Sequence, residues 1–313
     1  MYEQIPEIIG RYDRIIIHRH TRPDGDAIGA QAGLKLLLSR NYPGKKIYAV
    51  GDDPGRYSFV PSSKQDELTD EDFEGALCFV LDCSSPALIS DQRFRQAAHS
   101  VRIDHHLFVE QICDDEIVDT SAESCCGMIC DMARELNLEF TPDAATALYC
   151  GLVTDSGRFR YDSTGAGSFR RAAVLAEAGA DAPMVYAGLY SESYASVRRR
   201  AQYVLKIKFT GNGTAYIYNT AEELAAEGSD PYSISRGMVG VMSDLRGIDR
   251  WVNFTEAESC ILCEIRSSVY NINQVAVKYG GGGHPKASGC TLKDREEAMK
   301  LLADLDALGT VDK

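Results

Sequence analysis

The feature that most constrains the fold is an alternation of short apolar runs with helical segments through the first half of the chain. Strands are predicted at residues 14–19, 46–50, 76–81 and 100–103. Helices are predicted at 27–40, 122–136 and 142–153, the last with Thr141 as N-cap and Pro142 at its first position. Because strands that alternate with helices pair in parallel, this pattern predicts an α/β domain whose parallel sheet is covered on both faces.

From about residue 181 the pattern changes to that of a smaller α+β domain. A helical connector is predicted at 186–205 and includes the basic run 198–200, which we interpret as a solvated face. Strands are predicted at 203–210, 214–219, 251–255, 259–266 and 287–292, and helices at 235–245, 273–279 and 294–305. The sequence Gly211-Asn212-Gly213 favours a hairpin turn between the first two strands. A chain of 313 residues exceeds the usual size of one core, so we expect domains at 1–185 and 206–313 joined by a linker at 186–205.

Composition narrows the class of protein. The ten cysteines lie mostly inside apolar runs, which favours reduced, buried thiols over disulfides. No apolar stretch approaches the roughly 18 residues that span a bilayer, and the acidic start is unlike a signal peptide, so we expect a cytoplasmic protein with no membrane partner. A net charge of −13 argues against a protein that coats long nucleic acid.

Acidic and histidine side chains follow three of the predicted strands, and one more acid closes a helix. The first strand is followed by the loop H-T-R-P-D-G-D. Ligands bind beyond the carboxyl ends of parallel strands, and imidazole with carboxylate suits ions such as Mn²⁺. The pattern therefore predicts one metal site, built from His20, Asp24, Asp26, Asp82, Asp104, His105, His106 and Asp155.

Simpler readings exist for single members of this set. The aspartates after Pro23 could merely cap the following helix, although capping explains none of the other acids. His18 lies two residues before His20 on the same strand face and competes with it as a ligand. His284 and Arg266 could likewise be a structural turn histidine and a plain surface charge.

Taken in order, these motifs resemble the DHH phosphoesterase superfamily. The matching features are H-x-x-x-D-x-D, the strand-terminal Asp82, D-H-H at 104–106 and T-D-S-G around Asp155. In the second half, the segment Tyr279-Gly-Gly-Gly-Gly-His284-Pro-Lys-Ala-Ser-Gly289 and the stretch Glu264-Ile-Arg266-Ser look like the accessory domain DHHA1. The combination is similar to the nanoRNase/pAp-phosphatase branch, in which the family spacing selects His20 over His18.

The resemblance implies two divalent ions, Mn²⁺ before Co²⁺ or Mg²⁺. His20 and Asp24 would hold one ion, Asp26, His105 and Asp155 the other, and Asp82 would bridge them. Asp104 would orient a histidine, and His106 would face the phosphate. In the second domain a glycine turn would offer backbone N–H groups to the substrate's terminal phosphate, with the residues Arg266, Gly281, Gly282, Gly283 and His284.

The implied activity is hydrolysis of short oligoribonucleotides, including linear dinucleotides such as pApA and pGpG, to 5′-mononucleotides. Removal of the 3′-phosphate from 3′-phosphoadenosine 5′-phosphate is a second implied activity. Alternatives within the class are a cyclic-dinucleotide phosphodiesterase, a pyrophosphatase and a DNA exonuclease. A nucleotide-sensing binding protein is the non-enzymatic alternative, but it predicts a missing metal ligand and none is missing. The resemblance leaves a homodimer and the ranking of substrates open.

Overall fold

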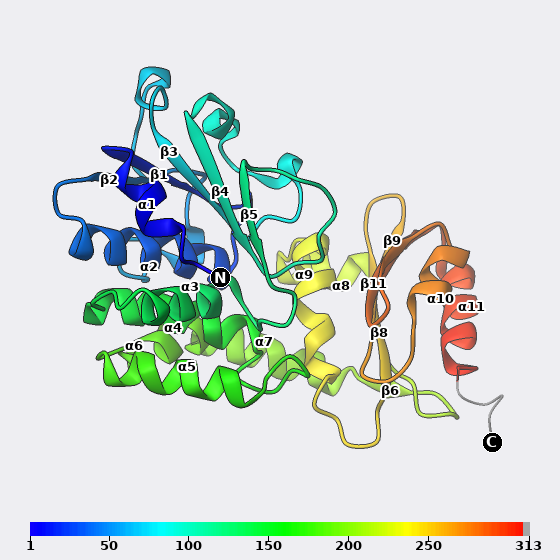
Figure 1. Cartoon of the computed structure of the whole chain (residues 1–313). Helices are drawn as coiled ribbons and strands as arrows, with labels where there is room; N and C mark the ends of the chain where they lie inside the picture. The colour runs from blue at the N-terminus through cyan, green and yellow to red at the C-terminus, as the bar shows by residue number, and fades with distance from the viewer. Residues whose placement is uncertain (309–313) are drawn as a thin grey trace. The chain divides into compact units, whose positions relative to one another are not determined.

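The computed structural model describes residues 1–308 and contains two compact units that divide between Ser191 and Glu192 (Figure 1). The division falls inside the segment 186–205 that the sequence assigns to a linker. Positions 309–313, the end of the expected second domain, lie outside the described residues. Within residues 1–308, no helix combines the length and apolar character needed to cross a membrane.

The first unit is built on a five-stranded sheet in the order β2-β1-β3-β4-β5, and every neighbouring pair is parallel. Its strands are β1 (Arg14–His18), β2 (Lys46–Ala49), β3 (Leu77–Leu81), β4 (His99–Asp104) and β5 (Asp115–Val118). All five residues of the central strand β3 are buried, which explains its continuous apolar sequence. The predicted fold class is confirmed for this unit.

The two faces of this sheet are covered differently. One face packs on helices through the side chains of Ile15 and Ile17, and the other buries Ile16 under loops and short 3-10 turns. The helices are α1 (Ile5–Gly10), α2 (Gly25–Asn41), α3 (Cys125–Glu135), α4 (Pro142–Asp155), α5 (Ala166–Glu177) and α6 (Ala182–Tyr190). The 3-10 turns are at Gly55–Tyr57, Asp70–Asp72, Pro86–Leu88 and Gln92–Gln96. Among the five strands of this unit, only β1 and β2 are joined by an α-helix, which is α2. Both faces of the sheet are covered as predicted, one by helices and the other by loops and 3-10 turns.

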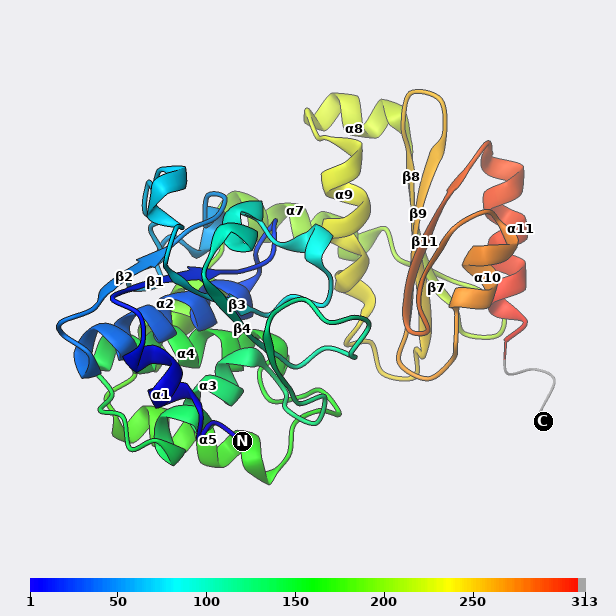
Figure 2. The ribbon, with the colours of Figure 1, turned by 45° about the horizontal axis from the view of Figure 1, so that its top comes forward.

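The second unit has a six-stranded mixed sheet in the order β10-β11-β9-β8-β7-β6, in which only β7 and β8 pair in parallel. Its strands are β6 (Lys208–Phe209), β7 (Ala215–Asn219), β8 (Arg250–Glu256), β9 (Ile261–Ser267), β10 (Gly282–His284) and β11 (Ala287–Leu292). The helices are α7 (Tyr194–Leu205), α8 (Ala221–Glu227), α9 (Pro231–Met238), α10 (Asn273–Lys278) and α11 (Arg295–Asp306), with a 3-10 turn at Val239–Met242. In Figure 2, α9 lies on one side of this sheet and α10 and α11 lie on the other.

Several boundaries differ from the sequence predictions. The predicted connector 186–205 covers the end of α6 and the whole of α7, because Ser193 caps α7 and separates it from α6. The predicted strand 203–210 is wrong over its first part: Tyr203 belongs to α7, and only two residues pair with β7 across the expected hairpin. The glycine segment was expected to be a turn, but its last part, Gly282–His284, forms the edge strand β10. All ten cysteines are free, and eight of them are buried, as expected.

Candidate functional site

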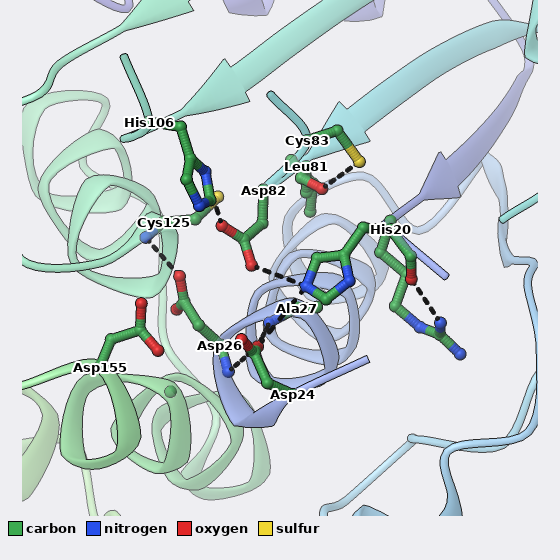
Figure 3. Close-up of polar contacts among 12 residues, drawn as sticks. His20, Asp24, Asp26, Ala27, Leu81, Asp82, Cys83, His106, Cys125 and Asp155 are labelled. Carbon is green, nitrogen blue, oxygen red and sulfur yellow. Dashed lines mark hydrogen bonds and ion pairs between the residues drawn. The ribbon is translucent and has the colours of Figure 1, made fainter. Parts of the chain in front are cut away.

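The acidic and histidine residues at the strand ends of the first unit converge at the carboxyl edge of its sheet (Figure 3). His20 follows β1, and Asp24 is the N-cap of α2, where its Oδ1 accepts hydrogen bonds from the N–H groups of Asp26 and Ala27, both at 3.0 Å. The capping interpretation is therefore correct for Asp24. Asp24 also belongs to the cluster, since His20 Nε2 lies 3.7 Å from the same oxygen.

The cluster contains two separate groups of side chains, and a third set overlaps both of them. His20, Asp24 and Asp82 form the first group, Asp26, His105 and Asp155 form the second, and Asp82, His105 and His106 form the overlapping set. Asp82 Oδ2 lies 3.4 Å from His20 Nε2, and its Oδ1 lies 3.4 Å from His105 Nε2. His105 Nε2 is also 3.4 Å from Asp155 Oδ2. The six side chains expected to bind metal are thus gathered, with Asp82 between the two groups.

Asp82 has a backbone conformation that non-glycine residues rarely adopt. Its φ is +57°, in the left-handed region, and its side chain is 2% exposed. Such strain persists where the surrounding structure compels it, and it concentrates at functional sites. Here the left-handed turn follows the buried strand β3 directly, and the carboxylate lies 3.4 Å from the Nε2 atoms of both His20 and His105. Figure 3 shows the same carboxylate between His20 and His106.

The N-terminus of α3 holds Asp26. The fully buried carboxylate accepts hydrogen bonds from the backbone N–H of Cys125 at 2.7 Å and of Cys126 at 2.9 Å. These are donors that a helix leaves unpaired at its start, and the helix dipole there favours a negative charge. Gly151 permits this packing, because a Cβ at that position would lie 2.6 Å from Asp26 Oδ1. The sequence analysis missed this support, which joins residues about a hundred positions apart.

His106 is oriented by a buried carboxylate. Its Nδ1 lies 2.7 Å from Asp104 Oδ1, and Arg102 donates a short hydrogen bond to the other oxygen of Asp104. The side chains of Arg102 and Asp104 are both fully buried, and Arg102 also pairs with Glu116 at 2.9 Å. The hydrogen bond to Asp104 raises the pKa of His106. Sequence alone marked Asp104 as an orienting residue but did not reveal Arg102.

The charges of the cluster are unbalanced without a cation. Burial, and then the nearby Asp26 and Asp82, raises the pKa of Asp155 to about 9. Burial alone would lower the pKa of His20, but contacts with Asp24 and Asp82 raise it to about 11. Without a cation, protons on Asp155 and His20 therefore offset the negative charge of the cluster. Metal binding would release them, because metal ligands bind in their deprotonated forms.

Two buried atoms at the centre of the cluster lack hydrogen-bond partners within residues 1–308. They are Asp82 Oδ1 and His105 Nε2. Buried polar atoms almost always have a partner, so these two atoms indicate a missing ligand. Carboxylate oxygens and imidazole nitrogens together form a donor set that suits divalent transition ions. The residues present therefore fit a metal centre.

His18 does not belong to this cluster. Its ring is fully buried between Phe73 and Phe94, and its Nε2 lies 3.3 Å from Cys78 Sγ. The three arginines at 198–200 lie on α7 and are exposed, in agreement with a solvated face.

Four of the five residues expected to bind phosphate in the second unit line one cavity of about 720 Å³. Arg266 on β9 pairs with Ala287 on β11, and Ala287 pairs with His284 on β10, so Arg266 and His284 share one sheet face. Gly281 and Gly282 also line the cavity, whereas Gly283 does not. Gly282, Gly283 and His284 form the strand β10, whereas Gly280 lies in a turn before it with a φ of +74°.

Comparison with known proteins gives the family of the chain. The chain belongs to the DHH family: its residues 14–152 match the model of the DHH family N-terminal domain, and residues 216–308 match the DHHA1 domain. The expected family of phosphoesterases is therefore confirmed.

The relatives give more detail. The chain is 35% identical to the bifunctional oligoribonuclease and PAP phosphatase NrnA of Bacillus subtilis, over 98% of each chain. It is 32% identical to the probable bifunctional oligoribonuclease and PAP phosphatase NrnA of Streptococcus mutans, over 95% of this chain and 96% of that one. Its fold matches the crystal structure of an exopolyphosphatase-related protein from Bacteroides fragilis with a TM-score of 0.85 and 24% identity, over 97% and 95% of the two chains.

Proposed function

We propose that the chain is a metal-dependent phosphodiesterase that cleaves short oligoribonucleotides, including linear dinucleotides, to 5′-mononucleotides. We also propose that it removes the 3′-phosphate from 3′-phosphoadenosine 5′-phosphate. The observation that carries the proposal is the pair of side-chain groups at the sheet edge, in which Asp82 contacts His20 of one group and His105 of the other. The activities named for the relatives in Bacillus subtilis and Streptococcus mutans support this choice of substrates.

The cofactor in this proposal is a pair of divalent ions, with Mn²⁺ as the first candidate. One would lie among His20, Asp24 and Asp82, and the other among Asp26, His105 and Asp155. When bound, such a pair lowers the pKa of water and offsets the negative charge that develops on the phosphate. The two cations would then offset the repulsion among the carboxylates of Asp24, Asp26, Asp82 and Asp155.

His106 has the features required of a general acid. Asp104 fixes its Nδ1, so Nε2 remains for the substrate, and its raised pKa favours the protonated form. In this role it would protonate the leaving oxygen when the phosphodiester bond breaks. Arg102 supports the step indirectly, because it holds Asp104 in its charged form.

The second unit would bind the phosphate-bearing end of the substrate. Arg266 and His284 offer N–H donors from one sheet face, and guanidinium groups match the geometry of phosphate. We place the enzyme in the cytoplasm because its free cysteines suit a reducing compartment. Its acidic net charge of −13 supports small substrates over long nucleic acid.

The test is a panel of substrates incubated with the protein and Mn²⁺. The panel contains pApA, pGpG, a cyclic dinucleotide, a long oligonucleotide and 3′-phosphoadenosine 5′-phosphate. We expect rapid turnover of the linear dinucleotides and of the bisphosphate. Asp82→Asn is the matched inactive variant, because asparagine tolerates the left-handed backbone at this position. Turnover of the cyclic or long compound, with the linear dinucleotides left intact, would refute the proposal.

A further inference from the structure

A glutamate lies between two arginines in the cavity of the second unit. Glu264 Oε2 is 3.0 Å from Arg266 Nη1, and Glu264 Oε1 is 3.4 Å from Arg236 Nε. Glu264 and Arg266 are 17% and 28% exposed, whereas the side chain of Arg236 is 81% exposed. One carboxylate therefore contacts two guanidinium groups at the place where an anion is expected to bind.

The fold brings these three side chains to one place. Residues alternate along β9, so Ile265 packs in the core beneath α10 and α11 while Glu264 and Arg266 face the opposite side. The helix α9 covers that side, anchored by Asn253 Nδ2, which donates to the carbonyl of Ser235 at 2.9 Å. Arg236 follows Ser235 and reaches the cavity from this helix.

The small residues of β11 keep the floor of the cavity open. Glu264 pairs with Gly289, which in turn pairs with Gly282 on β10. Arg266 pairs with Ala287, which pairs with His284. With neighbouring strands about 4.8 Å apart, Arg266 and His284 stand on backbones about 10 Å apart with only a methyl group between them. A phosphate group fits in that space.

Arg266 presents one edge of its guanidinium to this space. Its Nη1 is occupied by Glu264 and by the carbonyl oxygens of Ile265 and Ser288. In the part of the chain that the structure describes, Nε and Nη2 of Arg266 make no hydrogen bond. These two nitrogens form the edge that grips a phosphate with two parallel hydrogen bonds.

The charges at the cavity are few. Its charged side chains are Arg236, Glu264 and Arg266, and its other titratable groups are Tyr232, Cys263, His284 and Cys290. Two guanidinium groups and one carboxylate leave a net charge near +1, and a phosphate monoester carries about −1.5 to −2 at neutral pH. A site of this charge suits one phosphate group. It offers no compensation for the additional charge of a triphosphate end.

We infer that Arg236 is a second phosphate-binding cation of this cavity and that Glu264 limits the negative charge the cavity accepts, so that it selects an end with a single phosphate. This inference rests on the proposed function, because the ligand is the substrate's phosphate-bearing end. Arg236 adds attraction to the grip of Arg266. Glu264 holds both arginines in place and repels any phosphate beyond the first.

The experiment measures binding to the full-length protein in EDTA, which separates it from catalysis. The ligands are ApA, pApA and pppApA, and dissociation constants are obtained by calorimetry. The variants are Glu264→Gln, Arg236→Gln and the double variant, with Glu258→Gln as the control. Glu258 is exposed and makes no ion pair among residues 1–308. Its replacement by glutamine changes the net charge by the same amount as Glu264→Gln.

Wild type should bind pApA more tightly than ApA, and pppApA no more tightly than pApA. Glu264→Gln should tighten binding of pApA about tenfold, the effect of one unit charge at roughly 6 Å under an effective dielectric constant of about 40. It should tighten binding of pppApA further and leave ApA unchanged. Arg236→Gln should weaken binding of pApA by a similar factor, and the double variant should return close to wild type.

Equal effects on ApA and pApA, or no effect of either substitution, would overturn the inference. Arg236 is exposed, so its replacement leaves folding intact and keeps the test valid even if the Glu264 variant unfolds. A failure of the proposed function would look different. In that case wild type with Mn²⁺ would not cleave pApA, whatever the binding results in EDTA.

Discussion

Asp155→Asn should stabilise the metal-free protein while weakening its response to metal. Asp155 ends α4, its side chain is 22% exposed, and its Oδ2 lies 3.4 Å from His105 Nε2. Burial and the neighbouring Asp26 and Asp82 raise its pKa from 3.8 to about 9. At pH 7 the folded protein therefore keeps a proton on Asp155 that the unfolded chain has released.

The size of the effect follows from these pKa values. One pKa unit corresponds to about 1.4 kcal/mol, so holding the proton at pH 7 costs up to about 1.4 × (7 − 3.8), or about 4 kcal/mol. Asparagine has nearly the same shape and needs no proton. We expect the variant without metal to be more stable at pH 7 by about 2–4 kcal/mol, because relaxation and solvent reduce the full value.

The gain should depend on pH in a defined direction. The stability associated with protonated Asp155 is fully present below pH 3.8 and is lost as the pH rises toward about 9. The difference between variant and wild type should therefore nearly vanish at pH 4 and grow through pH 8. Carboxylates outside the cluster contribute to both proteins alike, so the difference reports Asp155 together with its coupling to Asp26, Asp82 and His105.

The assay is urea unfolding followed by circular dichroism, in EDTA and again in excess Mn²⁺. Metal at about 100 times its dissociation constant should stabilise wild type by about 2.7 kcal/mol per site, and the variant by less. Asp162→Asn is the control, because Asp162 is exposed and makes no ion pair within residues 1–308. A variant that is less stable than wild type in EDTA, or equally stabilised by Mn²⁺, would refute the reasoning.

Three further substitutions test the supports of the site. Asp52→Asn removes a carboxylate that pairs with the fully buried side chain of Arg19 and accepts from the N–H of Arg22, so stability in urea should fall by about 2 kcal/mol and Mn²⁺ affinity should fall with it. Unchanged Mn²⁺ affinity would show that Asp52 does not support the loop that carries His20 and Asp24. Gly151→Ala places a Cβ 2.3 Å from Cys126 Sγ, so it should lower the free energy of unfolding by about 1–3 kcal/mol and weaken Mn²⁺ binding. In the control Gly167→Ala the new Cβ meets nothing closer than 3.7 Å, so stability and Mn²⁺ binding should not fall. Asp104→Asn should lower kcat for pApA by about 10²-fold or more while the content of Mn²⁺ stays constant, since the Asp104 side chain contacts His106 and Arg102 and none of the six side chains expected to bind metal. Loss of metal would contradict that role.

The sequence predicted those parts of the fold whose signal is local. The strand β11 lies at the predicted positions 287–292, and α4 begins at the predicted Thr141 cap with Pro142. The edge strands β5 and β10 escaped prediction because they are short, and the side chains of neither strand are fully buried. Tyr203 was assigned to a strand because apolar residues alternate after it, but α7 extends to Leu205 and buries that ring.

The site shows the same division between local and distant signals. Histidines and aspartates at the ends of predicted strands were recognisable from motif spacing, and the structure gathers them. Their supports were not recognisable. Asp26 depends on N–H groups of α3, and Arg236 reaches Glu264 from α9, which covers the sheet face on which Glu264 lies. Contacts of this kind depend on tertiary packing, for which a single sequence carries no periodic pattern.

The central claim is that six side chains hold two cations, with Asp82 between the two metal positions. The most direct measurement is elemental analysis of protein that has been loaded with Mn²⁺ and then passed through a desalting column. We predict two manganese ions per chain for wild type and a clear loss for Asp82→Asn. A wild-type content near zero, or a content that Asp82→Asn leaves unchanged, would contradict the account.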